Sequence, residues 1–417
     1  MAARGLGSSG REDLVPPSRP AEERQFSALF SQSLGAVAFN TVGLMAGFIF
    51  ASFFELFSRR SWSIAAYPCV LTTRGMVGGV FCGRLTSGLW LGTIEPRFRA
   101  NTPEFKTLYC SMMVLSSLAA LMMACSISLY GLSWGITGQD VLDLVAAVVA
   151  TMALAFTTAP PISALVAFRS FERGLDPDVV TYPVSSASSD VIVTCCYTAT
   201  LALMYHGPLG RATVYAICLA FLAACALTAM RKLGEEGFRR TLREALASSA
   251  LVVVISGLTG TLLSEMNVTI GLGPEICTAY PALIGTVGDV GSIVGSTATT
   301  KLWSGEMEAR MGSLGEHRKE VAAAWAASAL MFSAYAFFSA LTGSLASLPS
   351  LLATFLLANL MAVALTVLLA FSASVATYKH GLDPDNFVIP VESSAADAIT
   401  TLSLLLASAA MLAVGVR

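Results

Sequence analysis

The sequence predicts an all-α, polytopic membrane protein with about eleven transmembrane helices, arranged as two parallel five-helix repeats joined by one extra helix. The first observation is composition: of 417 residues, 55% are apolar and only 12% are charged, where a soluble domain has about 25% charged residues. The second observation is a succession of apolar runs, and the third is a long sequence pattern that occurs twice. With a net charge of −2, this composition excludes a cytosolic globular enzyme and a nucleic-acid binding protein.

Each apolar run is long enough for a helix to cross the ~30 Å hydrocarbon core of a bilayer. The second and eighth runs are long and rich in Gly, Ser and Thr, which suits interrupted or tightly packed helices in a protein interior. In them, Gly79 with Gly83 and Gly291 with Gly295 have the spacing of closely approaching helices. The predicted spans are 29–54, 62–95, 107–131, 141–167, 184–205, 212–230, 246–265, 276–303, 321–347, 349–377 and 387–415.

The basic residues predict the orientation of these spans. If the N-terminus is cytoplasmic, 19 of the 25 Lys and Arg residues lie on the inner side and four on the outer side. Because Lys and Arg accumulate in cytoplasmic segments, we expect a multi-pass protein of the cell membrane with a cytoplasmic N-terminus and an external C-terminus.

An internal duplication is evident when the two halves are compared. Gly-Leu-Asp-Pro-Asp occurs at 174–178 and again at 381–385. In each copy a Pro follows five residues later and an Asp seven residues after that: Pro183 and Asp190, Pro390 and Asp397. Upstream, Tyr67-Pro68 pairs with Tyr280-Pro281, Gly75 with Gly288 and Gly78 with Gly291. Shared residues in register over this distance indicate a true repeat.

The duplication predicts the domain organisation. Residues 1–27 are polar and form a disordered cytoplasmic tail; 28–208 are the first repeat, 209–235 a linking transmembrane helix and 236–417 the second repeat. Five spans alone would invert the second copy, so the extra span makes the repeats parallel. They are therefore expected to be related by a pseudo-two-fold axis along the membrane normal, with the natural site on that axis.

Two polar stripes lie on otherwise apolar spans. Ser186, Asp190 and Thr194 are spaced four residues apart in the fifth span, and Ser393, Asp397 and Thr401 repeat this spacing in the eleventh. A charge inside a membrane helix costs at least about 2.5–3.5 kcal/mol, so it calls for a function or a partner. Across the pseudo-two-fold axis the two carboxylates would face each other and repel unless a cation lay between them. Asp190, Asp397, Ser186 and Ser393 are therefore candidate ligands of a divalent cation.

Four further acidic residues are candidates. Asp289 adjoins Gly288 and breaks the symmetry, because Met76 is its counterpart. Glu392, opposite Ser185, lies nearer the cytoplasm and could line the inner mouth of a pathway. Glu55 and Glu265, near the outer ends of the first and seventh spans, either gather cations or are ordinary interfacial charges.

The alternative for the two aspartates is structural: each pairs with an Arg or caps a broken helix. Arg74 and Arg84 are available only in the first copy, where the second has Val287 and Thr297, so one set of arginines cannot neutralise both aspartates symmetrically. The Asp-Pro of each repeated loop favours a helix start instead of a ligand.

The nine cysteines are interpreted as small packing residues in the spans, and no His is interpreted as a transition-metal ligand. Oxygen ligands alone favour Mg²⁺, Mn²⁺ or Ca²⁺.

These features resemble the MgtE family of divalent cation transporters, in the duplicated form similar to the eukaryotic solute-carrier magnesium transporters. The resemblance is carried by the early Pro and Gly-rich segment 280–289 and by the late Gly-Leu-Asp-Pro-Asp, Pro and Ser-x-x-x-Asp of each repeat. It implies that Asp190 and Asp397 line an ion pore and meet hydrated Mg²⁺, the transported ion. One chain would resemble the whole dimer of the bacterial proteins, a monomer that is a pseudo-dimer in the lipid bilayer.

The resulting hypothesis is a transporter with Mg²⁺ or another divalent cation as its partner, without enzymatic activity, a cofactor or a nucleic-acid partner. A secondary transporter for another cation or for an organic solute is the alternative. An intramembrane aspartyl protease is disfavoured, because residues 285–289 read Gly-Thr-Val-Gly-Asp and lack the Gly-x-Gly-Asp signature.

The segregation of the basic residues gives a topological prediction. A reporter at residue 1 or within 231–243 should be cytoplasmic, and one at Arg417 should be external, as measured by protease protection or impermeant labelling. If reporters at Gly210 and Arg417 were on the same side as the N-terminus, the parallel arrangement of the repeats would be wrong.

Overall fold

The computed structural model describes residues 26–173, 177–379 and 384–415. The predicted helix-start residues Asp176 and Asp383 lie outside this part. Within it, eleven helical segments are long and apolar enough to cross a membrane, so the predicted number is confirmed. Short elements α3 (Phe54–Ser58), η2 (Leu132–Trp134), η3 (Met311–His317) and η4 (Leu345–Ser347) connect them. The long helices are α1 (Phe26–Ala38) and α2 (Gly43–Ser52), joined by the 3₁₀ turn η1 (Phe39–Val42), then α4 (Ser61–Trp90), α5 (Pro103–Gly131), α6 (Gly138–Glu172), α7 (Pro177–Tyr205), α8 (Pro208–Lys232), α9 (Glu236–Thr269), α10 (Pro274–Trp303), α11 (Arg318–Thr342), α12 (Leu348–Lys379) and α13 (Pro384–Ala413).

Local sequence explains several helix starts. Pro103, Pro208 and Pro274 occupy the first turn of α5, α8 and α10, where a missing N–H costs nothing. Thr102 caps α5 by accepting a hydrogen bond from the Phe105 amide, and Thr137 forms a capping box at α6. The prolines remove a backbone donor at these helix ends, and the threonine caps satisfy one.

The two Gly-rich helices are continuous. Both α4 and α10 run through an internal proline, Pro68 and Pro281, without a break. Of the two options that the sequence left for these spans, tight packing is therefore the one observed. The interruption occurs in the first span instead, at the 3₁₀ turn between α1 and α2.

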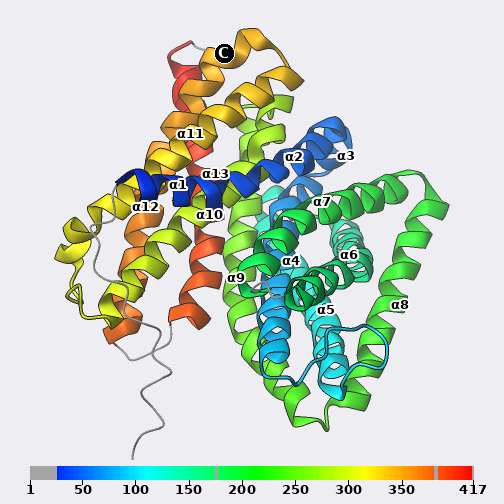
Figure 1. Cartoon of the computed structure of the whole chain (residues 1–417). Coiled ribbons are helices and arrows are strands. Elements are labelled where there is room, and N and C mark those ends of the chain that lie inside the picture. Colours follow the sequence, from blue (N-terminus) through cyan, green and yellow to red (C-terminus); the bar gives the residue numbers. More distant parts are fainter. Residues whose placement is uncertain (1–25, 174–176, 380–383, 416–417) are drawn as a thin grey trace, which may run out of the picture.

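The first helix of each repeat crosses to the other repeat. In the first repeat, α1 packs against α11 and α2 against α10, whereas in the second repeat α9 packs against α4 and α5. Each first helix also contacts the last helix of its own repeat, α2 with α7 and α9 with α13. Figure 1 shows α1 and α2 extending across the α10–α13 half, with α9 between the two halves. The two repeats are thus interlocked by exchanged helices.

Glycines permit both crossings. A Cβ at Gly47 of α2 would overlap the carbonyl oxygen of Thr278 in α10, and one at Gly260 of α9 would overlap that of Ala65 in α4. Ala65 and Thr278 are equivalent positions when Tyr67 is aligned with Tyr280. The same backbone site of each repeat therefore receives a glycine from the exchanged helix.

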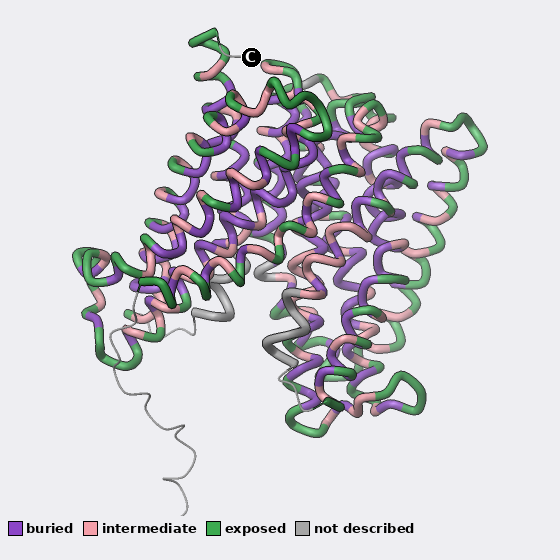
Figure 2. The backbone as a smooth tube through the Cα atoms, turned by 45° about the horizontal axis from the view of Figure 1, so that its top comes forward, coloured by how far each residue is buried: buried purple, intermediate pink, exposed green. Residues whose placement is uncertain are grey.

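The crossing helices separate two pairs of polar helices. α4 packs against α7, and α10 packs against α13, but the described parts of α7 and α13 show no extended packing along one another. α2 and α9 lie beside the two pairs and contact both. The linking helix α8 packs mainly against α5, α6 and α7, also touches the start of α9, and is mostly exposed, at the edge of the molecule (Figures 1 and 2).

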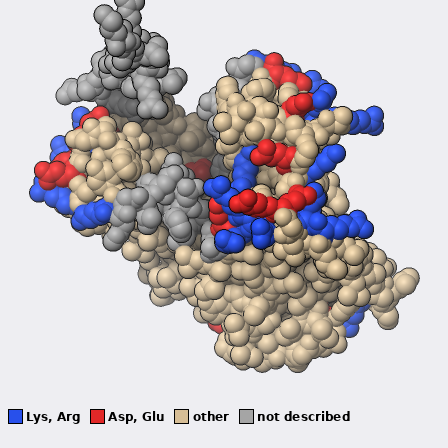
Figure 3. Space-filling view, turned by 90° about the horizontal axis from the view of Figure 1, so that it is seen from below, with Lys and Arg blue, Asp and Glu red and all other residues tan. Residues whose placement is uncertain are grey.

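Charged residues gather at one end of the helices. Seen from below, Lys, Arg, Asp and Glu cover two lobes of this face (Figure 3). Ion pairs of this end include Lys232 with Glu235 and Lys301 with Glu320. The face contains the connections that the sequence analysis assigns to the cytoplasm.

The close crossing of α9 and α4 gives a prediction with a control in the same fold. Gly260→Ala should lower the apparent melting temperature by several degrees, because overpacking costs about 1–3 kcal/mol. Gly83→Ala should leave it unchanged or raise it, since Gly83 has no neighbour within 4 Å of its Cβ position and Ala favours a helix. Detergent-solubilised protein heated stepwise and analysed by size-exclusion chromatography would test both; equal melting temperatures for the two variants would contradict the packing.

The open space at Gly83 also corrects the expectation that Gly79 and Gly83 mark a close approach of helices. At Gly83 it is wrong, whereas Gly291 and Gly295 do face neighbouring helices closely. Spacing identifies small residues but not which face of the helix has a neighbour.

Candidate functional site

A tyrosine of the early helix is hydrogen-bonded to the late helix in both repeats. The Tyr67 hydroxyl is 3.1 Å from Thr194 Oγ1, and the Tyr280 hydroxyl is 2.9 Å from Thr401 Oγ1. Each threonine also donates to the backbone carbonyl four residues earlier, that of Asp190 or Asp397, at 2.7 and 2.8 Å. The predicted repeat register is therefore reproduced in three dimensions, and each aspartate lies one helical turn from a buried anchor.

Asp397 is buried and contacts the opposite repeat. Its side chain is 8% exposed, and its Oδ2 accepts a hydrogen bond of 2.6 Å from Thr72 Oγ1 of α4. Sequence reasoning missed Thr72, whose counterpart in the second repeat is Gly285. The only available signal was a hydroxyl one turn after Pro68. This contact places Asp397 at the boundary between the repeats.

Asp190 occupies the equivalent position of α7 but has different surroundings. It is close enough to Asp397, Arg74 and Asp289 for their charges to interact. Its carboxylate accepts no hydrogen bond from any residue that the structure describes. The two aspartates are thus equivalent in backbone position but not in their partners.

Asp289 is held by a residue of the exchanged first helix. Asn40, in the 3₁₀ turn between α1 and α2, donates from Nδ2 to Asp289 Oδ2 at 2.6 Å. The same amide lies against Gly285, where a Cβ would be 2.7 Å from Asn40 Oδ1. Sequence reasoning missed Asn40, although an amide within an apolar run was a usable signal.

Glu392 directly precedes Ser393 in α13 and is almost fully buried, at 2% exposure. Its Oε2 accepts from Ser292 of α10 at 3.3 Å, and its Oε1 is buried without a hydrogen bond. The carboxylate fills the space above Gly291, which a Cβ there would occupy. Its charge interacts with those of Asp397 and Asp289, so the structure brings these three second-repeat carboxylates together.

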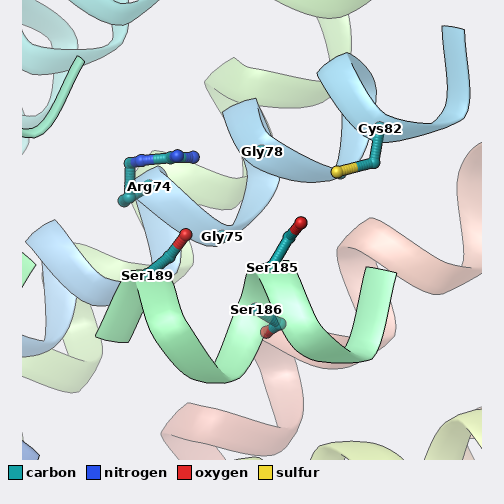
Figure 4. A pocket seen from close by; sticks show the side chains of 8 residues that line it. Arg74, Gly75, Gly78, Cys82, Ser185, Ser186 and Ser189 are labelled. Atoms are coloured by element: carbon teal, nitrogen blue, oxygen red, sulfur yellow. The ribbon is translucent and has the colours of Figure 1, made fainter. Parts of the chain in front are cut away.

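The two serines of the stripes differ in their surroundings. Ser186 of α7 lines a cavity of about 10 Å³ that is also bordered by Ser185, Ser189 and Arg74. Figure 4 shows Ser185 and Ser189 directed toward α4 and Ser186 directed away from it. Ser393 is half-buried on α13, with its Oγ 3.8 Å from the Cβ position of Gly288.

The remaining candidates are peripheral. Glu55 is exposed on α3 and Glu265 is exposed near the end of α9, and their cation-gathering role stays a prediction. Arg84, considered as a partner for the aspartates, instead binds Glu244 at 2.7 Å and Thr241 at 2.8 Å. Of the two arginines in α4, only Arg74 is near an aspartate.

The described part of the chain contains no group of three or more His, Cys, Asp or Glu residues arranged to hold a metal ion directly. The acidic residues of the interior are spread along α7, α10 and α13 around the boundary of the repeats. Such an arrangement suits an ion that keeps its water shell and meets carboxylates through water, as Mg²⁺ commonly does.

Comparison with known proteins gives one match. The family model of MgtE, described as a divalent cation transporter, matches residues 67–200 and again residues 280–407. Each matched region extends from the tyrosine of an early helix to the last turns of a late helix. No curated protein and no solved structure gives a significant match.

The hydrogen bond between Thr72 and Asp397 can be tested independently of transport. Thr72→Val should lower the free energy of unfolding by about 1–2 kcal/mol, because the buried carboxylate loses its donor. Thr73→Val is the control from the same helix, since Thr73 is more deeply buried than Thr72 and its one hydrogen-bond partner among the described residues is the Met123 sulfur at 3.8 Å. Unfolding in mixed micelles, combined with Asp397→Ala in a double-mutant cycle, would measure the coupling. A coupling energy near zero would refute the contact.

Proposed function

The chain belongs to the MgtE family of divalent cation transporters, and on that premise we propose that it carries hydrated Mg²⁺ through the membrane between its two repeats. The ion passes Asp190 and Asp397, which attract it through its water shell. The flanking carboxylates of Asp289 and Glu392 add to the negative potential. The duplicated chain supplies both halves of the pathway, so it acts as a monomer that resembles a dimer.

The observation that carries this proposal is an imbalance of charge. Four acidic side chains of the spanning helices, Asp190, Asp289, Glu392 and Asp397, form one electrostatically connected group, and Arg74 is the only basic residue near it in the described chain. Charges of one sign in a low-dielectric interior repel strongly. A divalent cation that visits the group relieves this repulsion.

The hydrogen-bond partners of the group support a hydrated ion. Thr72, Asn40 and Ser292 each occupy one carboxylate oxygen, on Asp397, Asp289 and Glu392 respectively. The second oxygen of each of these carboxylates has no such partner in the described residues, and that of Glu392, Oε1, is buried. Because Mg²⁺ gives up its waters reluctantly, a path lined by spaced oxygens favours it over a cage that must dehydrate it.

Substitution of the paired aspartates tests the proposal. Asp397→Asn and Asp190→Asn should each lower Mg²⁺ uptake into proteoliposomes at least about tenfold, because each removes a charge from the path at nearly constant volume. The fold should persist, as shown by an unchanged elution volume in size-exclusion chromatography. Uptake should be profiled with Mg²⁺, Mn²⁺, Ca²⁺ and Na⁺.

Glu244→Gln is the control for these variants. Glu244 is an exposed carboxylate whose partners are Arg84 and Arg240, and such pairs contribute little, so its removal should leave uptake unchanged. Wild-type uptake by both aspartate variants would refute the proposed pathway. Uptake of an organic solute without any cation flux would favour the alternative function.

A further inference from the structure

Equivalent glycines of the two repeats adjoin side chains of opposite charge. Gly78 of α4 and Gly291 of α10 are paired in the repeat register. A Cβ at Gly78 would be 2.6 Å from Arg74 Nη1, whereas a Cβ at Gly291 would overlap Glu392 Oε1. We call these spaces above the two glycines the first niche and the second niche. The first niche thus contains a guanidinium and the second a carboxylate.

Each of these two charged residues has an uncharged counterpart in the other repeat. The counterpart of Arg74 is Val287, and the counterpart of Glu392 is Ser185. Ser185 lines the small cavity beside Arg74 and Cys82, and its hydroxyl is buried. The first niche therefore has a positive charge from the early helix α4, and the second niche has a negative charge from the late helix α13. At the position equivalent to each charged residue, the other repeat has an uncharged residue.

Among the described residues, neither charge has an ion-pair partner. Arg74 is 4% exposed and makes no hydrogen bond or ion pair with the residues that the structure describes. Within the same described part of the chain, Glu392 has one hydrogen bond, of 3.3 Å to Ser292, and its Oε1 is buried with none. The Thr366 side chain lies against the same glycine as Glu392, and its buried hydroxyl is also unpaired. Unneutralised charges in a low-dielectric interior act over several ångströms.

The two repeats consequently present different potentials to the pathway. In the first, Arg74 offsets the charge of Asp190, with which it interacts. In the second, Asp289, Glu392 and Asp397 reinforce one another, and Val287 stands where the first repeat has Arg74, so the described residues provide no equivalent basic neighbour. The two repeats are thus similar in backbone arrangement, but they differ in the electrostatic potential that they create.

We propose that Arg74 is a tethered cation that displaces the transported ion from the pseudo-symmetry axis, so that a hydrated divalent cation is held beside the second niche by Glu392, Asp397 and Asp289. This inference rests on the proposed function and deepens it. Arg74 is a positioning residue, because it acts on the ion through the field and not by contact. It also lowers the affinity for the ion, which aids release of the ion into either compartment.

The test compares variants of the full chain in proteoliposomes, with Mg²⁺ as the probe. Arg74→Gln, which keeps length and polarity, should lower the half-saturating Mg²⁺ concentration about tenfold, because it removes a repelling charge. Glu392→Gln should raise it about tenfold. Arg74→Lys, which keeps the charge, should restore most of the wild-type value. Arg84→Gln is the control, because this arginine of the same helix pairs with the exposed Glu244. It should not shift the half-saturating Mg²⁺ concentration.

The direction of the shift separates this role from a structural one. A purely structural arginine, when removed, would lower the maximal rate and the stability without increasing apparent affinity. A half-saturating concentration that is unchanged or higher in Arg74→Gln would overturn the proposal. If that variant fails to fold, an unchanged value in Glu392→Gln overturns it equally.

Failure of the proposed function would look different. In that case wild-type protein would show no saturable Mg²⁺ flux, or Asp397→Asn would transport at the wild-type rate. The half-saturating Mg²⁺ concentration for thermal stabilisation of the purified protein gives a second readout of affinity, since a ligand that binds the folded state stabilises it. This concentration should shift in the same direction as the half-saturating concentration for transport. An opposite shift in Arg74→Gln would contradict the proposal that Arg74 displaces the ion.

Discussion

Charge in a low-dielectric interior is the constraint on which this structure depends. Asp190, Asp289, Glu392 and Asp397 lie on helices that must cross an apolar core, where each charge is costly. The fold places all four between α4 and α7 on one side and α10 and α13 on the other. More apolar helices cover these four, so the polar surfaces face each other and not lipid.

The exchange of the first helices makes that enclosure possible. α2 and α9 each contact both polar pairs, and Gly47 and Gly260 let them approach the opposite backbone closely. Asn40, which lies at the break between α1 and α2, reaches Asp289 of the other repeat as a result. The exchanged first span of the first repeat thus also supplies a hydrogen-bond donor to the acidic interior.

Pseudo-symmetry is kept where packing requires it and lost where charge acts. The tyrosine and threonine anchors are the same in both repeats, because they fix the separation of the early and late helices. The donors to the aspartates and the charges near them are not. A homodimer must have identical halves, but a fused duplication is free to differ between its halves, and here the difference is greatest at the niches with Arg74 and Glu392.

The sequence by itself determined the membrane class, the eleven spans, the duplication and the family, because hydrophobic length and repeated residues are properties of the chain alone. It also singled out Asp190, Asp397, Asp289 and Glu392, since a charge in an apolar run needs no structure to be noticed. Tertiary structure alone decided which partners these residues have. Thr72 and Asn40 come from distant segments, and Arg74 and Glu392 differ in register, so no spacing along the chain relates them. Those contacts follow from the crossing of helices, which depends on side-chain packing between elements that are far apart in sequence.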